Sequence, residues 1–152
     1  MNKIYINTDG GSRGNPGPAA IGVVFSDEKG QVFHNYKECI GITTNNEAEY
    51  RAIIKALEIL SKSSWLKENN SKEHKVVCRL DSQLVVEQLN GNYKIKQEHI
   101  RRFVDQIFQI TKEFKIDLSF VHVPREENKL ADKLVNEALD EETSSKQQTD
   151  NR

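Results

Sequence analysis

Three consecutive strand-like segments, joined by short turns, constrain the fold of this chain more than any other feature. They cover residues 3–9, 19–26 and 31–41. In the first of them Ile4 and Ile6 alternate with polar neighbours, which is the period-two pattern of a half-buried strand. Because such short connections hold no crossover helix, consecutive strands must run antiparallel. The sequence therefore predicts that the chain begins with a three-stranded antiparallel unit.

After these segments the pattern changes to helices that alternate with apolar strands. The predicted helices and strands are, in order, helix 43–62, strand 76–81, helices 82–91 and 100–114, strand 115–123 and helix 128–139. Strands that alternate with helices run parallel to one another in one sheet. The order β-β-β-α-β-α-α-β-α thus predicts an α/β fold with a mixed five-stranded sheet flanked by helices.

Composition sets the limits of these predictions. The 152 residues favour one domain, which we place at 1–140, and the segment 141–152 has no apolar side chain and is predicted to be disordered. A net charge of −1 gives no global positive field, so a nucleic-acid partner would have to be held by local geometry. No apolar run could span a membrane, and the N-terminus lacks the apolar core of a signal peptide. We expect a cytoplasmic monomer with no membrane association and no obligate protein partner.

Two aspartates close apolar strands. Asp9 stands at the predicted end of the first strand, just before Gly10 and Gly11, and Asp81 closes the fourth strand. Each has an ordinary explanation when taken alone, because Asp stabilises turns and caps helices. If the two strands are neighbours in the sheet, however, the two carboxylates lie close together.

A third acid is predicted to face the core. Glu49 shares one side of its helix with Ile53 and Ala56, whereas Glu47 faces away and fits a capping box. A carboxylate in that position needs a partner, and no arginine is an obvious candidate. Asp132 borders the apolar stripe of the last helix, where an ordinary solvated aspartate is the simpler interpretation.

Taken together, these acids indicate a metal site. Clustered carboxylates repel one another and raise one another's pKa unless a cation lies between them. Oxygen ligands without a Cys or His cluster favour Mg²⁺ or Mn²⁺ over zinc. Such ions most often serve phosphoryl chemistry, in which paired metals activate a water and stabilise the leaving oxygen.

Four linked segments of the chain resemble type 1 ribonuclease H. They are "TDGGSRGNPGPAAIG", "TTNNEAEYRAIIKALE", "DSQLVVEQLNGNYKIK" and "VPREENKLADKLVNEAL", and the resemblance covers about residues 1–140. It implies the ribonuclease H fold and metal-dependent endonucleolytic hydrolysis of the RNA strand of RNA/DNA hybrids, which leaves 5′-phosphate and 3′-hydroxyl ends. It also implies two Mg²⁺ ions, with Mn²⁺ as a substitute, and catalytic, metal-binding roles for Asp9, Glu49, Asp81 and Asp132.

The resemblance further implies contacts to the hybrid. By motif they fall at Gly10, Gly11, Asn15, Thr44, Asn45, Asn46, Gln83 and Arg125. Amides and backbone N–H groups can read groove shape and 2′-hydroxyls without reading base identity. Asn and Thr residues ahead of a helix are also common caps, so a purely structural role stays open for them.

Two departures from the family pattern concern the substrate and the mechanism. The basic protrusion of many members is reduced here to a short segment around Lys94, Lys96, Arg101 and Arg102. The loop before Asp132 contains no histidine, and His122 is predicted to be a structural residue of the last strand. Two other functions therefore remain open. One is a nuclease of the same fold that acts on double-stranded RNA or DNA, and the other is a non-catalytic hybrid-binding module.

Overall fold

The structure is a computed structural model that describes residues 3–68 and 74–150. Its strands are β1 (Lys3–Ser12), β2 (Gly17–Ser26), β3 (Val32–Thr43), β4 (His74–Leu80) and β5 (Ile116–His122). Its helices are α1 (Asn45–Ser61), α2 (Ser64–Glu68), α3 (Gln83–Leu89), α4 (Glu98–Glu113), the 3-10 helix η1 (Arg125–Glu127) and α5 (Lys129–Asp150). The predicted order is confirmed, and the short helices α2 and η1 are additions to it.

The five strands form one sheet in the order β3-β2-β1-β4-β5. The pairs β1–β2 and β2–β3 are antiparallel, whereas β1–β4 and β4–β5 are parallel. The prediction of a mixed sheet, antiparallel first and then parallel, is therefore confirmed. Because β1 is the central strand, it is the one that can bring residues of both halves together.

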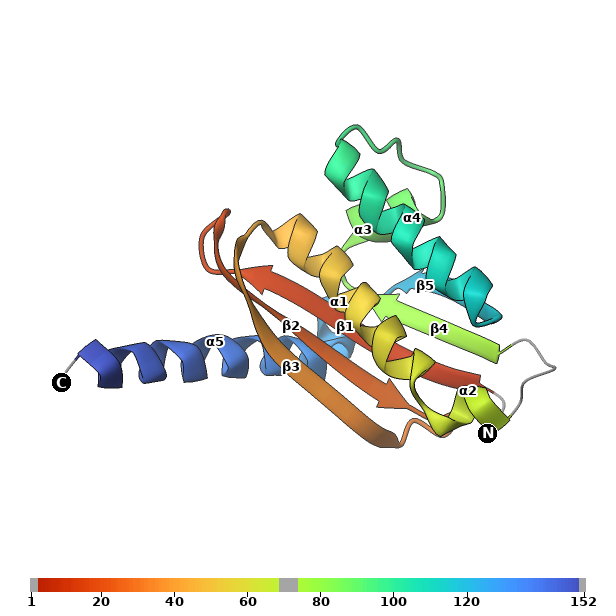
Figure 1. The fold of residues 1–152 in the computed structure, drawn as a ribbon, viewed down its shortest axis with the longest axis horizontal. Helices are drawn as coiled ribbons and strands as arrows, with labels where there is room; N and C mark the ends of the chain where they lie inside the picture. Colours follow the sequence, from red (N-terminus) through yellow and green to blue (C-terminus); the bar gives the residue numbers. More distant parts are fainter. Residues whose placement is uncertain (1–2, 69–73, 151–152) are drawn as a thin grey trace.

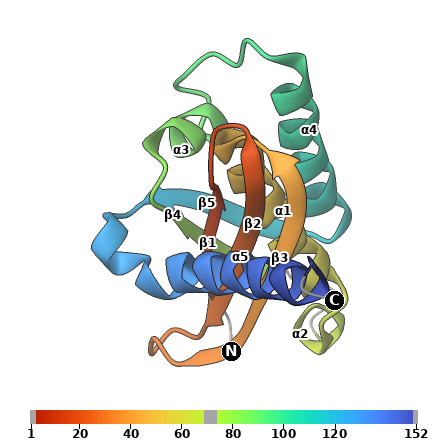
Figure 2. The ribbon, with the colours of Figure 1, turned by 90° about the vertical axis from the view of Figure 1, so that its left-hand side faces the viewer.

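Helices cover both faces of this sheet (Figures 1 and 2). The alternation along β2 shows why, since Val23 and Phe25 belong to the core that α1 and α4 complete. On the opposite face, Ala20 and Val24 pack against α5. Strand β2 is thus buried on both sides, and burial of apolar side chains on two faces stabilises the position of α1 and α5 about it.

Two glycines permit unusually close contacts between strands and helices. A Cβ at Gly22 would lie 2.4 Å from the carbonyl oxygen of Ala131, where α5 crosses β2. A Cβ at Gly10 would lie 2.3 Å from the carbonyl oxygen of Ala48 and 2.5 Å from the backbone nitrogen of Glu49. Glycine is required at both places because no side chain fits between backbones this close.

We expect Gly10→Ala to lower the free energy of unfolding by at least about 2 kcal/mol, because the new methyl group would push against helix backbone that cannot rotate away. Gly11→Ala is the matched control, since its Cβ would meet only a side-chain methyl of Val135 at 3.6 Å, an ordinary contact. Urea denaturation of both variants measures the difference. Equal stability of the two variants would contradict the close packing of β1 against α1.

The structure corrects the predicted end of the first strand. Asp9 does not close β1, which continues through Gly10 and Gly11 to Ser12. The pairing with β2 also continues, with Asp9 opposite Gly22 and Ser12 opposite Ala19. A partner strand supplies ladder hydrogen bonds that outweigh the low strand propensity of glycine, which is why the glycines misled the sequence interpretation.

The end of α5 also differs from the prediction. The helix continues to Asp150, beyond the predicted helix end at residue 139, and residues 151–152 lie outside the described part of the chain. Lys37 Nζ of β3 pairs with Glu141 Oε1 at 2.6 Å, and Thr143 Oγ1 donates to the carbonyl of Leu139 at 2.9 Å. Extension of a helix that is already nucleated and packed adds one hydrogen bond per ordered residue, so apolar side chains are not required.

Candidate active site

Three carboxylates, one in β1, one in α1 and one directly after β4, meet near the C-terminal ends of the parallel strands β1 and β4. In the parallel pair β1–β4, Asn7 lies opposite Arg79, and two residues further along Asp9 lies in β1 and Asp81 directly follows β4. Glu49 reaches them from the first turns of α1. One carboxylate oxygen of each of these acids lies within 4.8 Å of those of the other two. The predicted face of Glu49 is confirmed, since Glu49, Ile53 and Ala56 are all buried.

Asp132 joins these acids in one pocket of about 160 Å³. The four acids line it together with residues of β1, of the β1–β2 turn and of α5: Gly10, Gly11, Ser12, Arg13, Val135, Asn136 and Leu139, and also Arg125 of η1. Asp132 is half-buried and the sequence alone favoured a solvated surface residue. The structure instead places it beside the acids of the sheet.

Asn128 is the residue that positions Asp132, and sequence interpretation missed it. Its side chain is 1% exposed, donates from Nδ2 to the carbonyl of Thr8 at 2.9 Å, and accepts from Asn7 Nδ2 at 3.1 Å. Its backbone carbonyl accepts from the N–H of Asp132 at 3.1 Å. The start of α5 is therefore fastened to β1 next to Asp9. An asparagine directly ahead of a helix was the available signal, but that pattern ordinarily indicates only a cap.

Burial and mutual repulsion govern the protonation of these acids. Burial raises the pKa of Asp9 to about 7, with further contributions from the charges of Asp81 and Asp132. Burial also raises the pKa of Glu49 well above its usual value, and the charges of Asp9 and Asp81 add to the effect. The pKa of Asp81 is raised by burial, although the nearby charges of Arg125 and His122 oppose that shift.

The donor set fits a divalent cation. Glu49 Oε2 is buried and receives no hydrogen bond from any described residue, which is costly for a carboxylate unless a cation satisfies it. The three clustered ligands are all carboxylates, the donors that Mg²⁺ and Mn²⁺ prefer. A positive ion between them would remove the repulsion that raises the pKa of each acid.

The predicted contacts of the β1–β2 turn and of α1 lie side by side. Asn15 Oδ1 accepts from the backbone N–H of Asn45 at 3.0 Å, and Asn45 Oδ1 accepts from the backbone N–H of Ser12 at 2.8 Å. Thr44 is the N-cap of α1 and accepts from the N–H of Glu47 at 3.2 Å. These side chains therefore have structural bonds, as expected if their role is structural, and Asn45 is bonded to Ser12, which lines the acidic pocket.

The remaining predicted contacts lie on α1, α3 and η1. Asn46 is half-buried in the first turn of α1, and Gln83 is exposed at the start of α3. Arg125 is exposed and lines the acidic pocket. His122 lies in β5 opposite Leu80, as the strand pattern predicted, but its side chain is exposed rather than buried, and its charge acts on Asp81.

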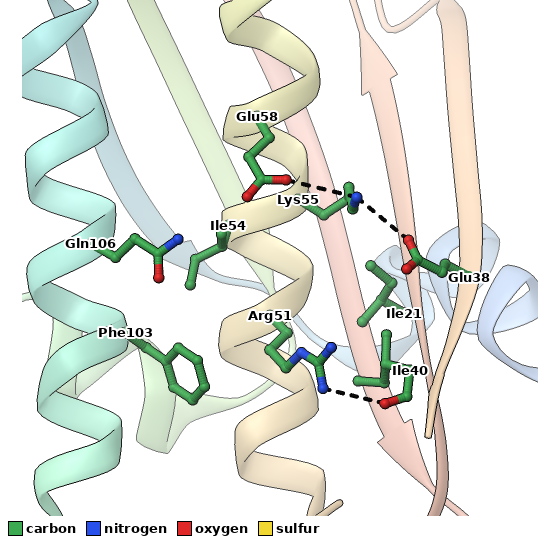
Figure 3. A pocket seen from close by; sticks show the side chains of 9 residues that line it. All are labelled: Ile21, Glu38, Ile40, Arg51, Ile54, Lys55, Glu58, Phe103 and Gln106. Carbon is green, nitrogen blue, oxygen red and sulfur yellow. Dashed lines mark hydrogen bonds and ion pairs between the residues drawn. The ribbon is translucent and has the colours of Figure 1, made fainter. Parts of the chain in front are cut away.

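A second pocket lies away from the acids (Figure 3). It measures about 250 Å³ and lies beside α1, with α4 on one side and strands β2 and β3 on the other. Its charged groups are already engaged: Lys55 Nζ is 3.5 Å from Glu38 Oε2 and 3.7 Å from Glu58 Oε2, and Arg51 Nη1 donates to the carbonyl of Ile40 at 3.3 Å. This second pocket is larger than the acidic pocket, but the acidic pocket contains the clustered carboxylates that can bind a metal.

Within the described ranges, no helix combines the length and the apolar character needed to cross a membrane.

Comparison with known proteins places this site in a family. A family model described as reverse transcriptase-like matches residues 7–138. The structure of LC11-RNase H1, isolated from compost by a metagenomic approach, is similar with 49% identity and a TM-score of 0.85, covering 94% of this chain and 99% of that chain. A structure of LC11-RNase H1 in complex with an RNA/DNA hybrid matches with 47% identity and a TM-score of 0.84, over 92% of this chain and 99% of that chain.

Longer relatives also match. Bifunctional protein Rv2228c of Mycobacterium tuberculosis is 39% identical over 139 residues, which are 91% of this chain. The chain spans only 36% of the length of that relative. Ribonuclease HI of Halobacterium salinarum is likewise 39% identical over 139 residues, which cover 91% of this chain and 65% of that protein.

An α/β fold with this strand order and a pocket of clustered carboxylates defines the ribonuclease H-like class of proteins. Within that class the sequence identity to LC11-RNase H1 extends over nearly the whole of both chains. This chain belongs to the type 1 ribonuclease H family.

Proposed function

We propose that the protein is a divalent-metal-dependent endoribonuclease that hydrolyses the RNA strand of RNA/DNA hybrids and leaves 5′-phosphate and 3′-hydroxyl ends. The observation that carries this proposal is the cluster of Asp9, Glu49 and Asp81, with one oxygen of each within 4.8 Å of the others. The crystal structure of the relative LC11-RNase H1 with an RNA/DNA hybrid supports the choice of substrate.

The proposed cofactor is a pair of Mg²⁺ ions, for which Mn²⁺ can substitute. Asp9, Glu49 and Asp81 would hold them, with Asp132 as the fourth ligand at the α5 side of the pocket. When bound, such ions supply an activated water and stabilise the charge on the leaving oxygen. Close packing of β1 against α1 fixes the positions of Asp9 and Glu49 in advance, so little reorganisation is needed on binding.

The groups around the acids would bind the duplex. Asn15, Asn45 and Gln83 offer short amides suited to the minor groove, where the base code is degenerate, so little sequence preference is expected. Gly10 and Gly11 line the pocket beside the acids, where the half-buried backbone of Gly11 can approach a 2′-hydroxyl. Thr44, at the start of α1, is the proposed contact to a DNA phosphate.

Cleavage of end-labelled substrates tests the proposal. We expect the RNA/DNA hybrid to be cut faster than an RNA duplex or a DNA duplex, and only when Mg²⁺ or Mn²⁺ is present. The Asp9→Asn variant, purified in the same way, controls for a contaminating nuclease. If RNA duplex or DNA is cut faster than the hybrid, that duplex is the preferred substrate. If the protein binds the hybrid but cuts none of these substrates, it is a binding module instead.

Arg125 is expected to assist turnover more than binding. It lines the acidic pocket, and its charge opposes the increase in the pKa of Asp81. Loss of one electrostatic group beside the reacting phosphate should lower kcat of Arg125→Ala by about tenfold or more, while KM changes by less than about threefold. Steady-state kinetics measure both quantities. Lys133→Ala is the control, because Lys133 is exposed on α5, pairs with Glu137 and does not line the acidic pocket. A rise in KM at unchanged kcat would show that Arg125 acts in binding.

A further inference from the structure

Arg13 is the one cation of the β1–β2 turn, and neither the motif comparison nor the metal site gives it a role. It follows β1 directly, and it lines the pocket that contains Asp9, Glu49, Asp81 and Asp132. Two arginines are among the residues that line this pocket, Arg13 toward α5 and Arg125 toward the end of β5. A polyanionic substrate that enters this pocket therefore meets two cations beside the four acids.

The two arginines use their charge differently. The charge of Arg125 acts on Asp81, one of the acids. The guanidinium of Arg13 instead donates from Nη2 to Asp140 Oδ1 at 2.6 Å and to the carbonyl of Asn136 at 3.5 Å, both on α5. Arg13 is thus at the border of the pocket but pairs with a carboxylate outside the metal-binding set.

The bond between Arg13 and Asp140 can be exchanged easily. The side chains are 44% and 68% exposed, so water and salt screen the pair and it contributes little to stability. A guanidinium can donate two parallel hydrogen bonds to a phosphate, whereas the bonds of Arg13 to described residues of α5 both come from Nη2. Arg13 can therefore leave Asp140 for a phosphate without a large loss in the stability of the fold.

We propose that Arg13 is a positioning residue that binds a backbone phosphate of the RNA strand next to the scissile one, and that Asp140 competes with this phosphate for its guanidinium. The strand is the RNA because Arg13 lines the same pocket as the acids that would act on the scissile phosphate. This inference rests on the proposed function, and it adds a phosphate contact and an internal competitor to it. It also gives the α5 end of the pocket a role, since Asp140 lies one turn beyond Asn136.

Two substitutions with opposite expected effects test the proposal. Arg13→Ala should weaken hybrid binding by about tenfold and reduce the dependence of log K on log salt by about 1, as expected for one lost phosphate contact. Asp140→Asn should tighten binding by about two- to fivefold, because it removes only a weak exposed competitor. Affinities are measured by fluorescence anisotropy across a salt series with Mg²⁺, in an Asp9→Asn background that leaves the hybrid uncut. Arg13→Lys should restore most of the salt dependence.

Lys37→Ala is the matched control. Lys37 also links a strand to α5 through exposed ion pairs, to Glu137 at 3.3 Å and Glu141 at 2.6 Å, but it does not line the acidic pocket. It should change hybrid affinity and its salt dependence much less than Arg13→Ala does. If Arg13 merely fastens the turn to α5, both Arg13→Ala and Asp140→Asn lower the melting temperature and weaken binding together.

The outcomes separate this inference from the function on which it rests. A wild-type chain that does not cut the hybrid with Mg²⁺ overturns the proposed function. A wild-type chain that cuts it, while Arg13→Ala keeps the wild-type affinity and salt dependence, overturns the role of Arg13 alone. Unchanged or weaker binding by Asp140→Asn overturns the exchange of partners. Only weaker binding by Arg13→Ala together with tighter binding by Asp140→Asn supports the proposal.

Discussion

Asp9→Asn is expected to remove nearly all cleavage of the hybrid while raising the stability of the metal-free protein at neutral pH. Loss of an outer partner of a metal site commonly lowers activity by 10–100-fold, so loss of a ligand should exceed about a hundredfold. The gain in stability follows from the pKa of Asp9, which burial and neighbouring acids raise to about 7. Hydrolysis assays with Mg²⁺ and thermal melts in EDTA measure the two effects.

The direction of the pH dependence follows from proton binding. At pH values between 3.8, the usual pKa of this carboxyl group, and about 7, its pKa in the folded protein, the folded protein retains a proton on Asp9 that the unfolded chain has lost. Stability of the metal-free wild type therefore falls as pH rises through this window, and the loss persists above it. Asp9→Asn lacks this contribution, so it should melt higher than wild type at pH 8 and nearly equal to it at pH 4. A variant that cleaves like wild type, or melts lower at pH 8, would contradict the assignment of Asp9.

Glu49→Gln is expected to be inactive, and Glu47→Gln is expected to retain activity. The two acids lie two residues apart in α1, but Glu49 is buried among the acids whereas Glu47 is partly exposed and lies outside the cluster. Loss of the Glu49 charge removes a metal ligand, so the rate should fall by more than about a hundredfold. Loss of the Glu47 charge affects only the start of the helix, at about 1 kcal/mol or less.

Parallel cleavage assays on these two variants, with Mg²⁺ titrated, measure the contrast. Circular dichroism should show both to be folded. The Gln at position 49 retains the shape of the side chain but is a much weaker ligand, so excess Mg²⁺ should restore little activity. An inactive Glu47→Gln with an active Glu49→Gln would mean that α1 presents its other face to the sheet.

Periodicity was sufficient to predict most of the fold and one side chain of the site. The alternation along β1 and β2 and the helical face of Glu49 are local patterns, and local patterns are what a single sequence records. The directions of the strands then followed from connection lengths, which decide between antiparallel and parallel runs, whereas the order of the strands in the sheet was not predicted. The grouping of Asp9 with Asp81 required only that their strands be adjacent.

The rest depends on contacts between segments far apart in the chain. Asp132 looks like a solvated helix residue until the buried Asn128 fastens the start of α5 to β1. Arg13 has no periodic neighbour that predicts its bond to Asp140, 127 residues later. His122 fits a strand pattern, yet its exposure depends on what covers the end of β5. Such cases are decided by tertiary packing and leave no local signal.

The contact at Gly10 has a consequence for how proteins on this scaffold can diverge. The separation of Asp9 and Glu49 is set where two backbones touch, since the space beside Gly10 is filled by main-chain atoms of Ala48 and Glu49 rather than by side chains. Substitution of core side chains elsewhere, such as Ile53, changes the free energy of unfolding through lost or added apolar contacts. We expect such a substitution to leave the distance between the two carboxylates almost unchanged, because the backbone contact at Gly10 is retained. Thermal adaptation and metal chemistry can therefore vary independently in such a chain, provided that this glycine is retained.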